Sequence, residues 1–107
     1  MKINKWFSTS EFICKSTDGP EVPYVDSELV KVLTDVREFF GQPVIIVNAY
    51  MTPGFNAAAD IIVKHVEPAL VYEYLDIKYP DSLGLGAGMH KGFNATHIDI
   101  RSKKARW

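Results

Sequence analysis

Hydrophobic and polar residues follow two different periods along this chain, and these periods predict its helices and strands. Apolar side chains recur at intervals of three and four over residues 26–40, the spacing that places them on one face of a helix. Asp26 is placed to cap this helix at its start, and Gly41 ends it. A second helix is predicted to begin at Pro68, where no N–H donor is needed, and to stop before Pro80.

Shorter apolar runs bounded by turn residues predict the strands. The predicted strands cover residues 44–47, 59–63, 84–89 and 96–101. A turn-rich loop over residues 50–56 separates the first two, and a tight turn at residues 91–94 joins the last two. Residues 1–24 lack a sustained period and are predicted to form an irregular arm with one short helix. The order of elements indicates an α+β fold, with two main helices covering a small, largely antiparallel sheet.

Composition places the chain among ordinary globular proteins. Its 107 residues are 47% hydrophobic and 23% charged, which suits a single domain over residues 1–107. The net charge of −1 gives no basic field, so nucleic acid and anionic membrane surfaces are not expected partners. Cys14 is the only cysteine, which excludes an intrachain disulfide. No stretch has the features of a membrane span or a signal peptide, and synthesis in a cytoplasm is expected.

The strand at residues 96–101 carries the candidate chemistry. Side chains in a strand alternate between its two faces, so His97, Asp99 and Arg101 are expected on one face, opposite to Ile98. A histidine on such a face can bind a metal or move a proton. The pattern is also that of a solvated face with a surface histidine.

Two further residues are candidates to join His97 in a metal site. With the turn at residues 91–94, Gly88 faces His97, and His90 lies on the same side of the sheet. Asp60, in the neighbouring strand, is either an ordinary strand-end residue or a ligand contributed from that strand. Imidazole and carboxylate ligands suit zinc, so the predicted metal ligands are Asp60, His97 and His90.

Four stretches of sequence, in order, give a family resemblance. They read FSTSEF at residues 7–12, FFGQPVII at 39–46, YMTPGFN at 50–56 and, after GLG at 84–86, THIDIR at 96–101. The third is similar to the motif Ser-Gly-Tyr-Arg-Thr/Ser-Pro-x-Tyr/Phe-Asn. Together the four stretches resemble the zinc D-alanyl-D-alanine carboxypeptidases. These are murein peptidases with the Hedgehog/DD-peptidase fold, here in the small form common in bacteriophages.

The resemblance implies roles for individual residues. Asp60, which follows a run of alanines, matches the family's aspartate zinc ligand, and His97 matches its C-terminal histidine ligand. Tyr50, Pro53 and Asn56 match residues that shape the substrate site. The implied activity is cleavage of a D-amino-acid peptide bond in peptidoglycan by a metal-activated water.

The chain also departs from the family it resembles. Asn56 runs almost directly into Asp60, so the stretch of about a dozen residues that holds the family's first histidine ligand has no counterpart. Met51 stands where the family has an arginine that supports the substrate, and Asn94 stands where some members have the general base. Asp99 is the candidate to act as a catalytic base instead.

Three hypotheses follow. The first is a peptidoglycan D-Ala-D-Ala carboxypeptidase or endolysin-like protein with a degenerate zinc site, impaired in catalysis, which holds zinc weakly or not at all. Its expected partner is a peptidoglycan peptide or a phage structural protein, and it is expected to be phage-encoded and to act at the bacterial cell wall. The second is an active zinc metallopeptidase that uses His90 as a replacement ligand. The third is an unrelated, non-catalytic interaction domain. The departures favour the first hypothesis and leave open whether the chain is an enzyme.

Overall fold

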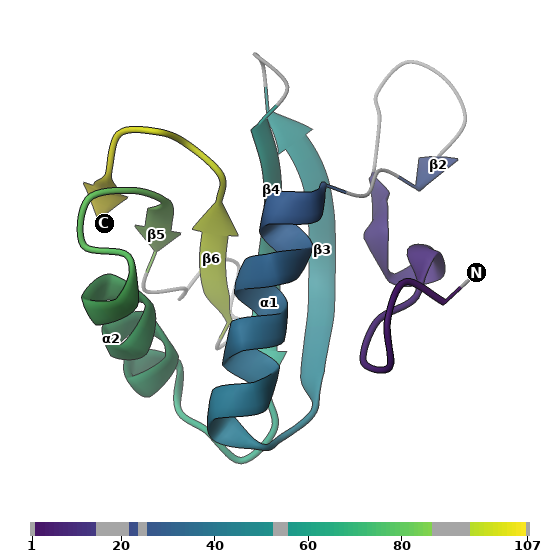
Figure 1. Ribbon diagram of the computed structural model, residues 1–107, viewed down its shortest axis with the longest axis horizontal. Helices are drawn as coiled ribbons and strands as arrows, with labels where there is room; N and C mark the ends of the chain where they lie inside the picture. Colours follow the sequence, from purple (N-terminus) through teal and green to yellow (C-terminus); the bar gives the residue numbers. More distant parts are fainter. Residues whose placement is uncertain (1, 15–21, 24–25, 53–55, 87–94, 107) are drawn as a thin grey trace.

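Two helices cover one face of a mixed sheet in the computed structural model of the chain (Figure 1). The structure describes residues 2–14, 22–23, 26–52, 56–86 and 95–106. Their elements are η1 (Thr9–Phe12), β1 (Ile13–Cys14), β2 (Val22–Pro23), α1 (Ser27–Phe40), β3 (Val44–Thr52), β4 (Asn56–Val63), α2 (Pro68–Lys78), β5 (Gly84–Gly86), β6 (Thr96–Asp99) and β7 (Ala105–Arg106). The predicted α+β class with two main helices is confirmed for these residues.

α1 forms because its end signals and its apolar stripe agree. The Asp26 side chain accepts hydrogen bonds from the backbone N–H groups of Glu28 and Leu29 at 2.9 and 3.0 Å, two donors that the first turn leaves without a partner inside the helix. Gly41, at a φ of 65°, ends the helix in the left-handed conformation that favours glycine. The buried stripe consists of Leu29, Val30, Val32, Leu33 and Val36.

α2 begins at Pro68 as predicted, but it has a weaker start than α1. Glu67 precedes it, and the Glu67 side chain makes no capping hydrogen bond. The apolar pattern of this helix predicts that Leu70, Val71, Tyr74 and Leu75 form its buried side. Val71 and Leu75 are buried, but Leu70 is 52% exposed. Successive residues are rotated by about 100° around a helix, so the stripe that buries Val71 turns Leu70 outward.

The sheet is mixed, which corrects the prediction of a largely antiparallel sheet. Its strand order in the described residues is β2-β1-β3-β4-β6-β5-β7. The pairs β3–β4, β4–β6 and β6–β5 are antiparallel, but β1 pairs in parallel with β3, and β7 pairs in parallel with β5. Strands as short as β1 and β7 span two residues each, so they leave no detectable period in the sequence.

The hairpin of β3 and β4 is longer than the sequence indicates. β3 continues to Thr52 and β4 starts at Asn56, so much of the predicted loop at residues 50–56 is strand. The apolar run at residues 44–47 predicts a buried strand, but only one side of β3 is buried there: Val44 is buried, while Ile45 is 50% exposed. Adjacent residues in a strand point to opposite faces, and only one face of this strand meets the helices.

The hydrophobic core lies between the helices and one face of the sheet. Ala59 and Ile61 of β4, Leu85 of β5 and Ile98 of β6 join the buried stripes of both helices in one cluster. Alternate residues of the same strands therefore point to the opposite face, which carries the candidate site.

Arg106 fastens β7 to the end of α2. Its guanidinium donates to the Asp76 carboxylate at 2.6 Å and to the backbone carbonyls of Tyr79, Ser82 and Leu83 at 2.8, 3.0 and 2.7 Å. These bonds cross the connection between α2 and β5. They therefore hold the start of β5, the strand beside the candidate site, close to the end of α2.

Candidate functional site

Asp60 and His97 meet across β4 and β6. The two residues lie directly opposite each other in the register of these antiparallel strands. Nδ1 of His97 lies 2.9 Å from Oδ1 of Asp60. The structure thus brings together the carboxylate and the imidazole that the sequence analysis assigned to one site, although 36 other residues separate them along the chain.

Three further side chains extend this pair into a hydrogen-bonded group. Nε2 of His97 lies 3.0 Å from Oδ2 of Asp99. Arg101 donates from Nε and Nη2 to the two Asp99 oxygens at 2.5 and 2.7 Å, the two-pronged geometry that suits guanidinium and carboxylate. Asn48 donates from Nδ2 to Oδ2 of Asp60 at 3.4 Å. We call these five residues, Asn48, Asp60, His97, Asp99 and Arg101, the His97 cluster.

Asn48 reaches the cluster because of a bulge in β3. The register between β3 and β4 shifts between Ile46 and Asn48, so Ile46 pairs with Ile61 and Asn48 pairs with Asp60. The extra residue at this point is Val47. Sequence reasoning missed Asn48, and nothing in the apolar run around Val47 signals the shift.

Gly84 of β5 makes room for the Asp99 carboxylate. Gly84 pairs with Asp99, and a Cβ atom on Gly84 would lie 2.4 Å from both Asp99 carboxylate oxygens. Gly86, rather than Gly88, lies opposite His97. The predicted register was therefore displaced by two residues, which leaves the faces unchanged because side chains repeat every two residues. The space above Gly84 is filled by a side chain of the cluster itself.

Burial of the charged groups in the cluster costs free energy unless each charge has a partner. Asp60 is 5% exposed and Asp99 is 1% exposed, while the His97 side chain between them is 16% exposed. A buried carboxylate is tolerated when it is paired and hydrogen-bonded. Here the imidazole and the Arg101 guanidinium supply the compensating donors and charge.

These neighbours shift the pKa values of His97 and Asp99. Burial lowers the pKa of His97, but the hydrogen bonds and charges of Asp60 and Asp99 outweigh burial and raise that pKa above 6.5. Burial raises the pKa of Asp99, but the hydrogen bonds and charges of Arg101 and His97 outweigh burial and lower it below 3.8. The cluster therefore favours an imidazolium between carboxylates, in which both ring nitrogens donate.

Two of the three predicted zinc ligands, Asp60 and His97, lie together in the cluster. Among the described residues no group of three His, Cys, Asp or Glu side chains converges to hold a metal. Asp60 and Asp99 bind opposite nitrogens of the His97 ring, so their carboxylates do not face a common point. A histidine binds zinc through a ring nitrogen, and each ring nitrogen of His97 here lies within hydrogen-bonding distance of a carboxylate. His90, the predicted third ligand, lies outside the described residues, and its role stays a prediction.

The other predicted site residues fall on or beside the β3–β4 hairpin. Tyr50 of β3 pairs with Ala58, and Asn56 of β4 pairs with Thr52. Pro53 lies outside the described residues. The roles of Tyr50, Pro53 and Asn56 in shaping a substrate site stay predictions.

Asp99 lies in the cluster, but its surroundings do not favour the predicted catalytic role. A carboxylate whose pKa is lowered holds a proton weakly, which makes it a poor general base near neutral pH. Its two oxygens are already engaged by Arg101 and His97. No observation tests the role of Asp99 as a base, so it stays a prediction.

Comparison with known proteins adds no assignment. No protein-family model, no curated protein and no solved structure matches the chain. Within the described ranges, no helix has the length and apolar character needed to cross a membrane. Function must therefore be argued from the His97 cluster and the sequence.

Proposed function

We propose that this chain is a relative of the zinc D-alanyl-D-alanine carboxypeptidases that binds a peptidoglycan peptide and is impaired in hydrolysis. Phage origin and action at the bacterial cell wall belong to the same proposal. The observation that carries it is the position of Asp60 directly opposite His97, with the second ring nitrogen of His97 on Asp99.

The placement of the two residues supports the family part of the proposal. Asp60 and His97 are the positions that the sequence resemblance matches to zinc ligands, and such ligands must lie within a few ångströms of each other. The 2.9 Å between Nδ1 of His97 and Oδ1 of Asp60 puts the two groups within that range.

The bonding of His97 supports the impaired part of the proposal. To bind His97, zinc must replace a hydrogen bond between one of its ring nitrogens and a buried carboxylate, that of Asp60 or of Asp99. Met51 carries no charge to stabilise a developing oxyanion, and loss of one such donor costs about a hundredfold or more in rate. Binding of a peptide without hydrolysis needs neither a bound zinc ion nor a cation that stabilises an oxyanion.

Three measurements on the purified protein test the proposal together. Zinc content is measured by mass spectrometry after dialysis against equimolar zinc. Release of D-alanine from a pentapeptide stem ending in D-Ala-D-Ala is followed by chromatography with added zinc. Binding is measured by co-sedimentation with purified peptidoglycan sacculi. We expect zinc well below one equivalent, no detectable D-alanine, and co-sedimentation of the protein.

The matched variants are His97→Gln and His65→Asn. His65 is an exposed histidine at a φ of 64°, a conformation that asparagine tolerates, so its replacement controls for loss of a histidine in general. We expect co-sedimentation to weaken only in His97→Gln. Stoichiometric zinc with release of D-alanine would instead establish an active metallopeptidase, with His90 as the ligand to test next. Absence of co-sedimentation would overturn the cell-wall assignment and favour a phage structural partner or an unrelated interaction domain.

A further inference from the structure

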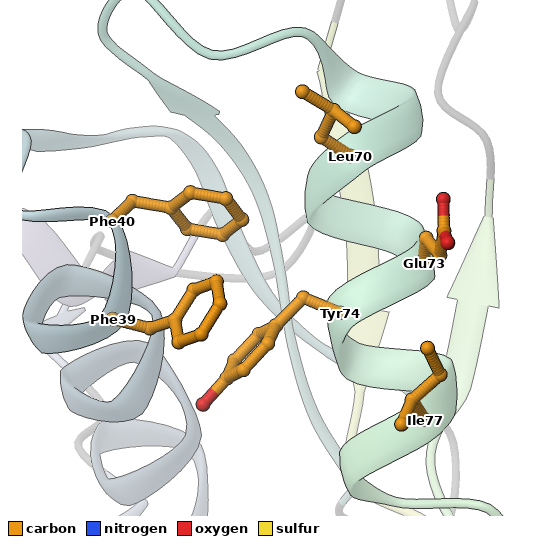
Figure 2. A pocket seen from close by; sticks show the side chains of 6 residues that line it. All are labelled: Phe39, Phe40, Leu70, Glu73, Tyr74 and Ile77. Carbon is orange, nitrogen blue, oxygen red and sulfur yellow. The ribbon is translucent and has the colours of Figure 1, made fainter.

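A second feature, on the helical side of the molecule, points to a partner. Three of the four large hydrophobic side chains that are exposed among the described residues line one groove between α1 and α2. Phe39, Leu70 and Ile77 are 61%, 52% and 71% exposed. The groove has a volume of about 440 Å³ (Figure 2). Scattered exposed apolar residues are ordinary, but a gathered set marks an interaction site.

Three aromatic rings in mutual contact line the groove. The rings of Phe39 and Tyr74 stack at 4.0 Å between centroids, and Phe40 meets both rings edge-on at 4.9 and 5.6 Å. Figure 2 shows Phe39 and Phe40 reaching from α1 towards Tyr74 of α2. Because these contacts hold the side chains in place before a partner arrives, binding would cost little side-chain entropy.

The dimensions of the groove suit a helix. Leu70, Tyr74 and Ile77 follow each other at intervals of four and three along α2, so they form one row. The row extends over eight residues, a rise of about 10 Å, which matches two turns of a partner helix. Apolar grooves of this kind accept amphipathic helices through side chains spaced by three and four.

The charge at the groove indicates which kind of helix it accepts. The lining residues in the described part of the chain include one charged side chain, Glu73, and Figure 2 shows it on the side of α2 turned away from Phe39. A partner with a lysine or arginine at the edge of its apolar stripe would place that cation beside Glu73. The α2 of a second copy would bring another Glu73, and the lysine that it offers, Lys78, lies at its last residue. A helix with cations along its whole edge complements Glu73 better, so charge favours a different protein.

We propose that the groove between α1 and α2 receives an amphipathic helix of a partner protein, with an apolar stripe and a basic edge. This proposal is independent of the metal and cell-wall assignments, because the groove lies on the helices and the His97 cluster lies on the other face of the sheet.

The test uses a labelled synthetic helix of about 15 residues, built from alanine, a leucine stripe and lysines along one edge. Its binding to the whole protein is measured by fluorescence anisotropy beside a matched peptide with glutamates in place of the lysines. We expect Ile77→Ser to weaken binding of the lysine peptide about tenfold, because it removes an apolar anchor from the groove. We expect Glu73→Gln to weaken it about threefold and to reduce its salt dependence.

Ile45→Ser is the matched control, since Ile45 is 50% exposed but lies outside the groove. Unchanged binding in this variant, with weaker binding in Ile77→Ser, would support the proposal. Equal binding of the lysine and glutamate peptides would overturn the choice of a basic partner. Binding that Ile77→Ser leaves intact would overturn the site. Dimerisation of the chain alone that Ile77→Ser abolishes would overturn the proposal in favour of a second copy.

Discussion

The two faces of β4 and β6 bury their side chains by different physical means. On the helix side, Ala59, Ile61 and Ile98 gain free energy from removal of apolar surface from water, and that gain needs no particular partner. On the opposite side, Asp60 and Asp99 are buried charges that each depend on a named donor. The apolar face should therefore lose stability in proportion to lost volume, whereas the polar face should respond to single atoms and to protons.

The largest effect is expected from a cavity on the helix face. Leu33 of α1 is fully buried, at 0% exposure. Leu33→Ala should reduce the free energy of unfolding by about 3 kcal/mol, because it removes apolar contacts and leaves a void. Urea denaturation followed by circular dichroism measures the loss. Ile77→Ala, at a side chain that is 71% exposed, is the control and should change stability by less than about 0.5 kcal/mol.

The next effect tests the tight fit on the polar face. Gly84→Ala should cost about 2 kcal/mol, because its new Cβ would lie 2.4 Å from the Asp99 carboxylate. The same substitution in an Asp99→Ser background should cost clearly less, since the shorter side chain leaves room. Denaturation of the two single variants and the double variant gives the coupling between these positions. Equal costs in both backgrounds would contradict the proposed clash.

A smaller loss of stability is expected from removing the N-terminal cap of α1, and none from the same change in α2. Asp26→Ala should cost about 1 kcal/mol, because it removes the acceptor for two backbone N–H groups at the start of α1. Glu67 holds the same position in α2 without a capping hydrogen bond, so Glu67→Ala should leave stability nearly unchanged. Thermal unfolding of both variants compares the two caps. A similar loss in each would show that capping does not distinguish the helices.

The last prediction concerns the pH dependence that the apolar face lacks. The pKa of His97 is raised, so its contribution to stability is fully present below pH 6.5 and is lost as pH rises through the raised value. The pKa of Asp99 is lowered, so its contribution is fully present above pH 3.8 and is lost as pH falls through the lowered value. Urea midpoints of metal-free protein across this range measure both slopes. His97→Gln should remove the loss on the alkaline side, and an unchanged slope would argue against His97 as its source.

Local signals in the sequence predicted the helices well. Asp26, Gly41 and Pro68 start or end a helix through contacts within one helical turn. Their effects can therefore be predicted without knowledge of the rest of the fold. It was also predictable that His97 and Asp99 share a face. Side chains in a strand alternate with a period of two, so a register displaced by two residues leaves each side chain on the same face.

Features that depend on pairing between strands were not predictable. The bulge that brings Asn48 opposite Asp60 is set by how β3 and β4 fit together, and it leaves no mark in an apolar run. The contact between Gly84 and Asp99 depends on the register in which β5 pairs with β6. The outward position of Leu70 depends on how much of α2 reaches the sheet.

The hydrogen bonds of Arg106 have a consequence for how the molecule opens. Besides these bonds, the Ala105 amide donates to the Leu83 carbonyl at 3.0 Å, and the Leu83 amide donates to the Arg101 carbonyl at 3.2 Å. Segments tied by so many shared bonds cannot exchange their amide hydrogens one at a time. The last turn of α2, β5 and β7 should therefore behave as one cooperative unit in native-state hydrogen exchange, with a common opening free energy for the Tyr79, Leu83 and Ala105 amides.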